Sequence, residues 1–316
     1  MTQQVVHGPG PAVRVSAAEQ RARLGYTLQK VIKRRSTLAF VLCLPLIVLV
    51  GGLIVQPFGY ALYLSTLNKS ETRFIGLGNF AFLFTRETFW LVVRQSCVFA
   101  LTAVFFKAVF GFVLSHLINA IPAKRQRVWR GLLLVPWVMP PALSTLAWLW
   151  MFDSSYSVLN WVLAPLGVDI PWLSDPFWAR AGVIAVNVWI GSPFFMIMYL
   201  AGLKSVPADL YEAAEIDGAS WWQKMIYVTL PMMRNIMAVT TLFSVIVTFA
   251  NFDIVRVLTN GGPRNTTELF GTWSFKLGIQ GGDIPLAASV SLFMFPVLAI
   301  LAFFILRNVR QRAADL

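Results

Sequence analysis

Long stretches without a single charged side chain dominate this sequence and limit it to few folds. A helix of about 20 apolar residues spans the roughly 30 Å hydrocarbon layer of a bilayer. Within that layer every backbone polar group needs an internal partner, which favours helices. Runs free of Asp, Glu, Lys and Arg cover residues 36–68, 131–152, 181–203, 235–252 and 284–306. Each run predicts a membrane-spanning helix.

A sixth span is expected over about residues 97–120, although Lys107 and His116 interrupt its apolar character. A buried lysine needs a partner or a water-filled cavity. An acid of another subunit is one such partner, and Lys107 is not assigned to a substrate. Only 13% of the residues are charged and 57% are hydrophobic, whereas soluble domains carry roughly a quarter charged residues. The sequence therefore predicts an all-α membrane protein with six transmembrane helices.

The placement of basic residues predicts the orientation of the chain. The formal net charge is +12, and basic residues are concentrated before the first span, between spans two and three, and in the tail. By the positive-inside rule, both termini are expected to be cytoplasmic, and nucleic acid is not expected as a partner. Lys69, Arg73 and Arg86, after the first span, fit this rule less well. The expected parts are a basic cytoplasmic segment at 1–36, compatible with an interfacial helix or a solvated tail, a transmembrane domain at 37–306 and a cytoplasmic tail at 307–316.

The sequence lacks recognisable motifs for nucleotide binding, metal binding and nucleophilic catalysis. It has no Gly-x4-Gly-Lys-Ser/Thr, no His-Glu-x-x-His and no paired Cys-x-x-Cys pattern. No nucleophile lies in a recognisable elbow. Cys43 and Cys97 both lie in predicted spans and are interpreted as packing residues. The chain is therefore not expected to be an enzyme by itself, and no metal site is predicted.

A polar, amphipathic segment at residues 205–231 separates two apolar runs and is predicted to form two short helices. Ser205 and Pro207 lie at the expected start of the first helix, since proline is tolerated in a first turn. Gly218 is expected to end that helix, because glycine adopts the left-handed conformation at little cost. So much ordered polar sequence between spans predicts that something outside the membrane docks there.

The second helix of this segment carries its own local signals. Ser220 and Gln223 have the spacing of a capping box, and Pro231 is expected to end the helix or to bend it into the next span. Glu215 and Asp217 break the local rules, because negative charge is unfavourable in the last turn of a helix. They are either a pair of solvated acids or a mark of function.

At these residues the sequence resembles a known family. The motif Glu212-Ala213-Ala214, followed by Gly218 and then Val228-x-Leu230-Pro231, resembles the EAA loop of binding-protein-dependent ABC importer permeases. That family usually has isoleucine in place of Val228, and its sugar-importing branch often has an acid at the position of Asp217. Residues 74–80 and 258–263 resemble further segments of the maltose-type carbohydrate permeases.

The resemblance implies a type I ABC importer permease fold in the inner membrane of a bacterium. It implies a second homologous permease subunit, two ATPase subunits that bind ATP and Mg, and an extracytoplasmic solute-binding protein as partners, with no cofactor on this chain. The EAA loop at 205–231 would insert a coupling helix into a cleft of an ATPase. The ATPase-coupling residues would be Glu212, Ala213, Ala214, Asp217 and Gly218.

A candidate substrate site lies in the fourth span. Asn187, Gly191 and Phe194 share one helical face by their i, i+4, i+7 spacing, while Trp189 lies off that face in an ideal helix. An amide beside aromatic groups suits a sugar, whose ring face packs on an indole and whose hydroxyls bond to the amide. The alternative is close helix packing through Gly191 and Ser192.

Polar groups at the end of the fifth span extend this candidate site. Asp253 either bonds to sugar hydroxyls or forms an intrahelical ion pair with Arg256. The resemblance implies that the sugar site is lined by Asn187, Trp189, Gly191, Phe194, Asp253 and Asn251. Some members of the maltose-type family have an amide in place of Asp253, and some have a tyrosine in place of Phe194. The resemblance therefore does not imply that the substrate is maltose.

Two other classes of protein compete with a sugar importer. An ion-coupled secondary transporter of a small polar solute is the main alternative, and the scarcity of acids within the spans argues against it. A membrane-embedded enzyme is the third class, for which no catalytic constellation is present. The sequence therefore favours a transmembrane subunit that forms, with a related subunit, the pathway for a saccharide or sugar derivative.

Overall fold

Helices make up the regular structure of this chain. The computed structural model describes residues 35–153 and 155–313, and within them the only bridge between extended residues joins Leu67 and Phe74. The expected basic segment at 1–36 lies outside the described residues except for Arg35 and Ser36, which belong to a helix. The chain divides into two units, Met1–Tyr60 and Ala61–Leu316.

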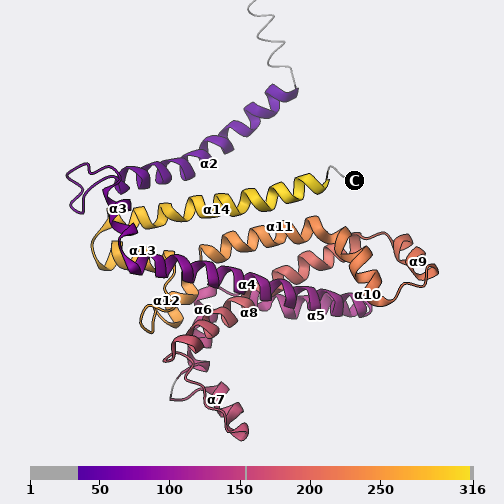
Figure 1. Ribbon diagram of the computed structural model, residues 1–316. Helices are drawn as coiled ribbons and strands as arrows, with labels where there is room; N and C mark the ends of the chain where they lie inside the picture. Colours follow the sequence, from indigo (N-terminus) through magenta and orange to yellow (C-terminus); the bar gives the residue numbers. More distant parts are fainter. Residues whose placement is uncertain (1–34, 154, 314–316) are drawn as a thin grey trace, which may run out of the picture. The chain divides into compact units, whose positions relative to one another are not determined.

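Helix α2 (Arg35–Ser65) supplies the described part of the first unit and continues into the second (Figure 1). None of its most apolar window is buried within the protein, and large side chains such as Leu42 and Leu53 are exposed. A helix that is apolar all round suits a lipid environment. This is the expected form of the first span.

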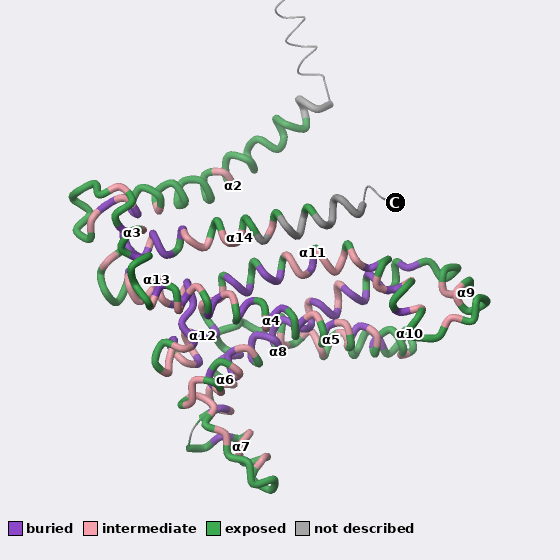
Figure 2. The backbone as a smooth tube through the Cα atoms, in the orientation of Figure 1, coloured by how far each residue is buried: buried purple, intermediate pink, exposed green. Residues whose placement is uncertain are grey.

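In the second unit, α8 (Pro176–Ser205) packs against α4 (Glu87–Ala120) and α11 (Leu230–Phe249). Buried residues are concentrated on α8 (Figure 2). Asp175 caps its N-terminus by accepting hydrogen bonds from the backbone N–H groups of Phe177 and Trp178. A Cβ atom at Gly111 would collide with Phe195, so a glycine permits the close approach of α4 to α8.

The third predicted span is not one helix. The chain forms α5 (Ala123–Val138) and α6 (Pro141–Met151), which meet at an angle of 89°. The residue before a proline is driven into the extended region, and both Met139 and Pro140 precede prolines and are extended. The prediction of a continuous helix over 131–152 was therefore wrong, and the consecutive prolines are the physical reason.

The remaining spans agree with the expected regions to different degrees. Within the described residues, helices at Ala39–Ser65, Glu87–Ala120, Pro176–Ser205 and Trp221–Phe249 are long and apolar enough to cross a membrane, with the bent α5–α6 pair as a further span. Helix α14 (Ile284–Ala313) contributes a shorter apolar stretch, Ile284–Ile300. The count of six spans stays a prediction.

Short helices occupy the two ends of the second unit (Figure 1). The two at one end are α9 (Ala208–Ile216) and α10 (Trp221–Lys224). Towards the other end lie α3 (Gly78–Phe84), α7 (Val158–Leu163) with the 3-10 turn η1 (Ala164–Leu166), α12 (Asp253–Leu258), and α13 (Phe270–Phe275), which continues into the π-helical turn η3 (Lys276–Gln280).

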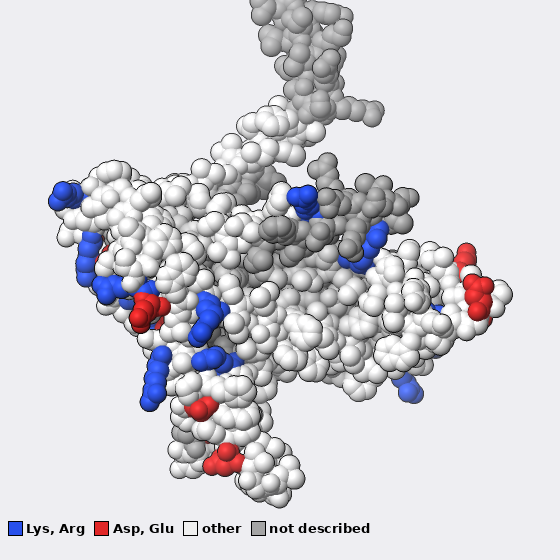
Figure 3. Space-filling view, viewed as in Figure 1, with Lys and Arg blue, Asp and Glu red and all other residues white. Residues whose placement is uncertain are grey.

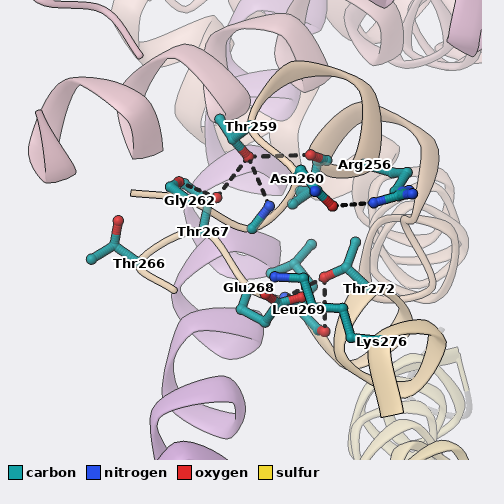
Figure 4. Close-up of polar contacts among 12 residues, drawn as sticks. Arg256, Thr259, Asn260, Gly262, Thr266, Thr267, Glu268, Leu269, Thr272 and Lys276 are labelled. Carbon is teal, nitrogen blue, oxygen red and sulfur yellow. Dashed lines mark hydrogen bonds and ion pairs between the residues drawn. The ribbon is translucent and has the colours of Figure 1, made fainter. Parts of the chain in front are cut away.

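The loop between α12 and α13 is held by its own side chains (Figure 4). The hydroxyl groups of Thr259 and Thr267 lie 2.7 Å apart, and Thr267 also donates to the carbonyl of Gly262 at 2.7 Å. The carboxylate of the buried Glu268 pairs with Lys276. The end of this loop is fastened to α4, because Ser96 accepts a hydrogen bond from the backbone N–H of Phe270 at 3.2 Å.

Candidate functional site

Residues 208–224, named here the α9–α10 segment, form an exposed tip on the second unit. Helix α9 has no buried residue, and Ile216 near its end is 88% exposed. Trp221 and Trp222 of α10 are also exposed. Figure 3 shows Asp and Glu side chains over α9, on a surface that is otherwise mostly uncharged. The tip thus presents acidic and apolar groups together.

The turn between α9 and α10 depends on Gly218. Its φ angle is +72°, a left-handed conformation that a Cβ atom disfavours. The N–H of Gly218 donates to the carbonyl of Glu215 at 3.0 Å, and that of Ala219 to Ala214 at 2.9 Å. This pair of bonds is a Schellman motif, which satisfies carbonyl groups at the end of the helix. The predicted role of Gly218 as the end of the first helix is confirmed.

The start of α10 also follows the sequence signal. The carboxamide oxygen of Gln223 accepts from the N–H of Ser220 at 2.7 Å, and the hydroxyl of Ser220 accepts from the N–H of Gln223 at 3.4 Å. The expected capping box is therefore confirmed.

Pro231 does not end the helix that α10 begins. The chain continues through the π-helical turn η2 (Met225–Thr229) directly into α11, in which Pro231 occupies the first turn. Proline lacks an N–H and clashes with the carbonyl four residues earlier. The widened turn lets Leu230 donate to the carbonyl of Met225. Of the two expected alternatives, an end of the helix at Pro231 or a bend into the next span, the end is not observed: the helix continues into the next span through the π turn.

Glu215 has a partner that its position in the sequence does not reveal. Its carboxylate lies 2.7 Å from the ammonium of Lys224 on α10. This hydrogen bond and the attraction of the cation lower the pKa of Glu215. The unfavourable charge at the end of α9 is thus balanced by a contact between α9 and α10, so only Asp217 of the two acids lacks an ion pair among the described residues.

Buried polar contacts connect the α9–α10 segment to the spans. The hydroxyl of Tyr211 lies 2.9 Å from that of Thr229, in the π turn that leads into α11. Val206, just before α9, is buried in the core between α4, α8 and α11. At the same end of α8, Lys204 donates to the side chain of Gln126 on α5 at 2.8 Å. These contacts join the α9–α10 segment to α11 and to the end of α8.

At membrane depth, Gly191 lies against a lysine of a neighbouring helix. A Cβ atom at Gly191 would come within 2.6 Å of Cε and 3.0 Å of Nζ of Lys107. Lys107 is only 5% exposed and donates a hydrogen bond to the hydroxyl of Thr248 on α11 at 2.8 Å. No acid pairs with Lys107 among the described residues. The fourth span thus contacts a buried cation rather than only an apolar helix.

Two amide groups near Gly191 and Thr248 in the sequence, one on α8 and one in the turn after α11, have unused acceptors. The side-chain oxygens of Asn187 and Asn251 are buried and accept no hydrogen bond from any described residue. Asn187 precedes Gly191 by one helical turn, and Asn251 follows Thr248 by three residues. We name Lys107, Asn187, Gly191, Thr248 and Asn251 the polar cluster: Lys107 contacts Gly191 and Thr248, and the two asparagines are included by their places in the sequence. The sequence analysis did not assign Lys107 or Thr248 to this site; the only signal was a lysine inside a span.

The aromatic residues of the predicted substrate site pack against other aromatic rings. The ring of Phe194 stacks on Trp137 of α5 at 5.0 Å between centroids and also contacts Phe243 of α11 at 5.1 Å. Trp189 is 37% exposed and packs edge-on against Trp148 of α6 at 5.5 Å. The structure therefore does not bring Trp189 onto the face that Asn187 and Gly191 share.

Asp253 is the exposed first residue of α12, two residues after Asn251. The intrahelical ion pair with Arg256, one of the two alternatives for Asp253, is not formed within the described residues. Arg256 instead donates to the side chain of Asn260 and lies over the ring of Phe275, 4.8 Å from its centroid. An aromatic face and an amide have replaced the acid as its partners.

Residues 107–315 match the family of binding-protein-dependent transport system inner membrane components. The chain belongs to this family. The match begins at Lys107 and includes the α9–α10 segment and every residue of the predicted substrate site. The chain is thus a multi-pass inner membrane permease.

Named relatives of this permease are transport proteins. It is 31% identical to the trehalose/maltose transport system permease protein MalF of Thermococcus litoralis, over 83% of this chain and 90% of the relative. It is 33% identical to the galactooligosaccharides transport system permease protein GanP of Bacillus subtilis over 70% of this chain, and 32% identical to the maltose/maltodextrin transport system permease protein MalF of Salmonella typhimurium over 78%. This permease spans only 56% and 51% of those two bacterial relatives.

A solved structure has the same fold. A chain of a bacterial ABC transporter involved in the import of the acidic polysaccharide alginate superposes with a TM-score of 0.77 at 24% identity, covering 90% of this permease and 99% of that chain. The predicted all-α, type I permease fold is therefore confirmed.

Proposed function

We propose that this permease forms, together with a second homologous permease subunit, the membrane pathway of an ATP-driven importer for a saccharide or sugar derivative. An extracytoplasmic binding protein would deliver the substrate, and two ATPase subunits would bind the ATP and Mg. Both termini and the α9–α10 segment would lie on the cytoplasmic side. Support for the class of substrate comes from the relatives, which transport trehalose, maltose, maltodextrin or galactooligosaccharides by name.

The α9–α10 segment is the single feature that carries this proposal. A docking element must expose contact groups while keeping its own shape, since only a rigid element transmits a displacement. Ile216 offers an exposed apolar contact, and Glu212, Ala213 and Asp217 are exposed around it. The pairing of Glu215 with Lys224 and the turn at Gly218 support this shape without a partner.

The route of the displacement runs through buried contacts. Closure of the ATPases would move α9, and Tyr211 would pass the movement to Thr229 and so to α11, while Val206 would pass it to α8. Helices α8 and α11 both carry residues of the polar cluster. A movement between these two helices would therefore change access to the cluster, as alternating access requires.

Within the membrane, we propose the polar cluster as the substrate-facing region. Unused buried acceptors cost free energy unless something bonds to them, and sugar hydroxyls are donors that suit the oxygens of Asn187 and Asn251. Lys107 would donate to a sugar oxygen in place of Thr248. Phe194 would supply an aromatic boundary to this region. Trp189 and Asp253 would contact the substrate only after a change in conformation, or where the pathway is shared with the second permease subunit.

Reconstitution tests the proposed function. The permease, its partner permease, the ATPases and the binding protein are placed in proteoliposomes, and uptake of a panel of radiolabelled saccharides is measured with ATP present or absent. The expected result is uptake that requires ATP and the binding protein, with ATPase activity stimulated by one class of saccharide. Robust uptake by this chain alone, driven by an ion gradient, would instead identify a secondary transporter and overturn the proposal.

A further inference from the structure

A pocket of about 350 Å³ lies between α4, α8 and the loop that follows α12. It is separate from the polar cluster and shares no residue with it. Polar groups of Arg94, Gln95, Arg180, Thr266 and Thr267 line it together with apolar side chains of α4 and α8. The loop wall is preorganised, because Thr266 donates to the carbonyl of Pro263 and Thr267 donates to that of Gly262. The bonds of Thr267 are drawn in Figure 4.

Gln95 adds hydrogen-bonding groups without a partner to the wall of this pocket. Its side chain is only 7% exposed, and both its amide nitrogen and its amide oxygen are buried without a partner among the described residues. A buried amide without hydrogen bonds is costly, so natural proteins rarely keep one that nothing satisfies. A ligand for Gln95 must offer both an acceptor and a donor.

Two arginines at the pocket add a requirement for negative charge. Arg180 donates through Nε to the backbone carbonyl of Thr266 at 3.1 Å, which leaves its terminal amino groups for another partner. Arg94 makes no hydrogen bond or ion pair with another residue of the part that the structure describes. Lys and Arg side chains gather over the end of the unit that carries α12 (Figure 3). Paired guanidinium groups are well suited to bind a phosphate.

The arginines lie at the depth expected for lipid headgroups. Residues 95–106 after Arg94 and residues 181–203 after Arg180 contain no charged side chain. Each arginine therefore marks the point at which its helix enters the hydrocarbon layer. Trp90, Phe177 and Trp178 flank the same ends of α4 and α8, as aromatic residues do at a membrane interface.

An apolar groove continues from the pocket along the same pair of helices. Val98, Arg180 and Ile184 line both hollows, and the groove extends to Phe110 and Val188. From Val98 to Phe110 a helix rises about 18 Å, close to the roughly 15 Å depth of one leaflet. The site thus has a polar, cationic pocket at one end and an apolar groove as long as one leaflet. A lipid with an anionic headgroup and an acyl chain has the complementary chemistry.

We propose that this pocket binds an anionic glycerophospholipid of the extracytoplasmic leaflet. The phosphate lies between Arg94 and Arg180, and one acyl chain follows the groove past Val98 and Ile184. The Gln95 side chain turns towards the pocket on binding, so that its amide N–H donates to a phosphate or ester oxygen and its amide oxygen accepts from a headgroup hydroxyl. Phosphatidylglycerol offers all of these groups. The assignment to the outer leaflet rests on the orientation proposed above, whereas the binding itself does not.

Native mass spectrometry of the full-length permease, purified in detergent, tests this site without measuring transport. The protein is incubated with phosphatidylglycerol, with phosphatidylcholine of the same acyl chains, or with glycerol phosphate, and retained adducts are counted. We expect one retained phosphatidylglycerol that neither other compound displaces. Arg94→Gln/Arg180→Gln is expected to weaken retention about tenfold or more, because hydrogen bonds to charged groups are lost. Arg73→Gln, on the exposed loop after α2, is the matched control.

A second variant guards against loss of folding in the double variant. Val98→Trp fills the groove from an exposed position and leaves both arginines in place. It is expected to abolish retention of phosphatidylglycerol while the helical circular dichroism signal stays unchanged. Equal retention of the two lipids, displacement by glycerol phosphate, or unchanged lipid retention in the arginine variant would each overturn the proposal. None of these measurements depends on uptake. Failure of the proposed transport function would therefore not decide whether the lipid binds.

Discussion

The α9–α10 segment and the polar cluster are built in opposite ways. The segment is contiguous in sequence and exposed, and it holds its shape through its own contacts, Glu215 with Lys224 and Ser220 with Gln223. The polar cluster comes from three helices and the turn after α11; Lys107 and Asn187 are buried, and the acceptors of Asn187 and Asn251 are unused. A self-supporting surface can meet a partner without rearranging, whereas an unsatisfied interior keeps its capacity to bind. The two regions thus suit two different tasks, the reception of force and the contact with substrate.

Gly218→Val should break the first side of this comparison most severely. A side chain in the left-handed conformation costs about 1–2 kcal/mol, and a β-branched one will redirect α10. We expect uptake in the reconstituted complex to fall roughly tenfold or more, since about 1.4 kcal/mol is a tenfold change. Gly167→Val is the matched control: Gly167 also has a positive φ and open space around it, but it lies after α7. Equal losses in both variants would argue against a docking role.

Lys107→Met tests the second side with nearly constant volume. Removal of a buried ammonium that no acid balances should leave thermal stability unchanged or raise it, because the desolvation penalty disappears. Uptake should fall roughly tenfold, as expected for the loss of a hydrogen bond from a charged group worth about 1.5–3 kcal/mol. Thermal stability is measured by thermal unfolding of the purified chain, and transport is measured as uptake by the reconstituted complex. Unchanged uptake and unchanged stimulation of the ATPases would remove Lys107 from the substrate region.

Gly191→Ala should produce a smaller loss at the same place. The new methyl group would lie 2.6 Å from Cε of Lys107, and the flexible lysine chain must move away at a cost of about 1 kcal/mol. We expect a few-fold loss of uptake with normal assembly of the complex. Gly182→Ala on the same helix is the control, since its methyl group would meet Phe152 at an ordinary 3.5 Å. A larger effect at Gly182 would show that α8 responds to packing alone.

Tyr211→Phe sharpens the comparison by weakening the link between the two regions. It removes the hydroxyl that lies 2.9 Å from Thr229, a contact worth about 1 kcal/mol. The expected outcome is a few-fold rise in the number of ATP molecules hydrolysed per substrate molecule imported, while the complex of permeases and ATPase subunits still assembles. Tyr227→Phe serves as the control, because Tyr227 is 74% exposed. If both variants keep the ratio of the wild-type complex, Tyr211 does not transmit the movement.

The smallest effect is expected from pH. Lys224 lowers the pKa of Glu215 in the folded protein, so the pair stabilises the segment above the usual Glu pKa of about 4.3. That stabilisation is lost as the pH falls through the lowered pKa. Hydrogen exchange of the amides in α9 and α10, compared between neutral and acidic pH, should show a slight loosening in acid. Glu215→Gln should remove that pH dependence; a variant with the same dependence as the wild type would assign it to another group.

The same contrast explains what could be predicted from the sequence. The turn at Gly218 and the capping box of Ser220 and Gln223 were correct because both arise from neighbours within a few residues. The partner of Glu215 was missed, since its contact with Lys224 depends on how the turn orients α10. The acceptor of Lys107 lies 141 residues away on α11, and no local pattern specifies that contact.

The helices show the same division between local and distant causes. The apolar runs predicted where spans lie, and the fold was correct. The sharp bend between α5 and α6 was missed, although Pro140 and Pro141 are visible in the sequence, because the count of apolar residues took no account of backbone conformation. The faces that α8 presents were only partly predicted: ideal helical spacing set Trp189 apart from Asn187 and Gly191, as in the structure, but their contacts with α4 depend on three-dimensional packing.

Cross-linking at Ile216 tests the central claim, that the α9–α10 segment receives force from an ATPase, most directly. Cys43 and Cys97 are replaced by serine, and Ile216→Cys or, as the control, Tyr156→Cys is introduced; the two side chains are 88% and 87% exposed. The complex is treated with a heterobifunctional reagent that forms a disulfide with the cysteine and an amide with a lysine of a neighbouring subunit. Ile216→Cys should then cross-link to an ATPase subunit, block uptake, and regain uptake on reduction, while Tyr156→Cys should not reach the ATPase. Full uptake with Ile216→Cys and no cross-link to the ATPase would contradict the account.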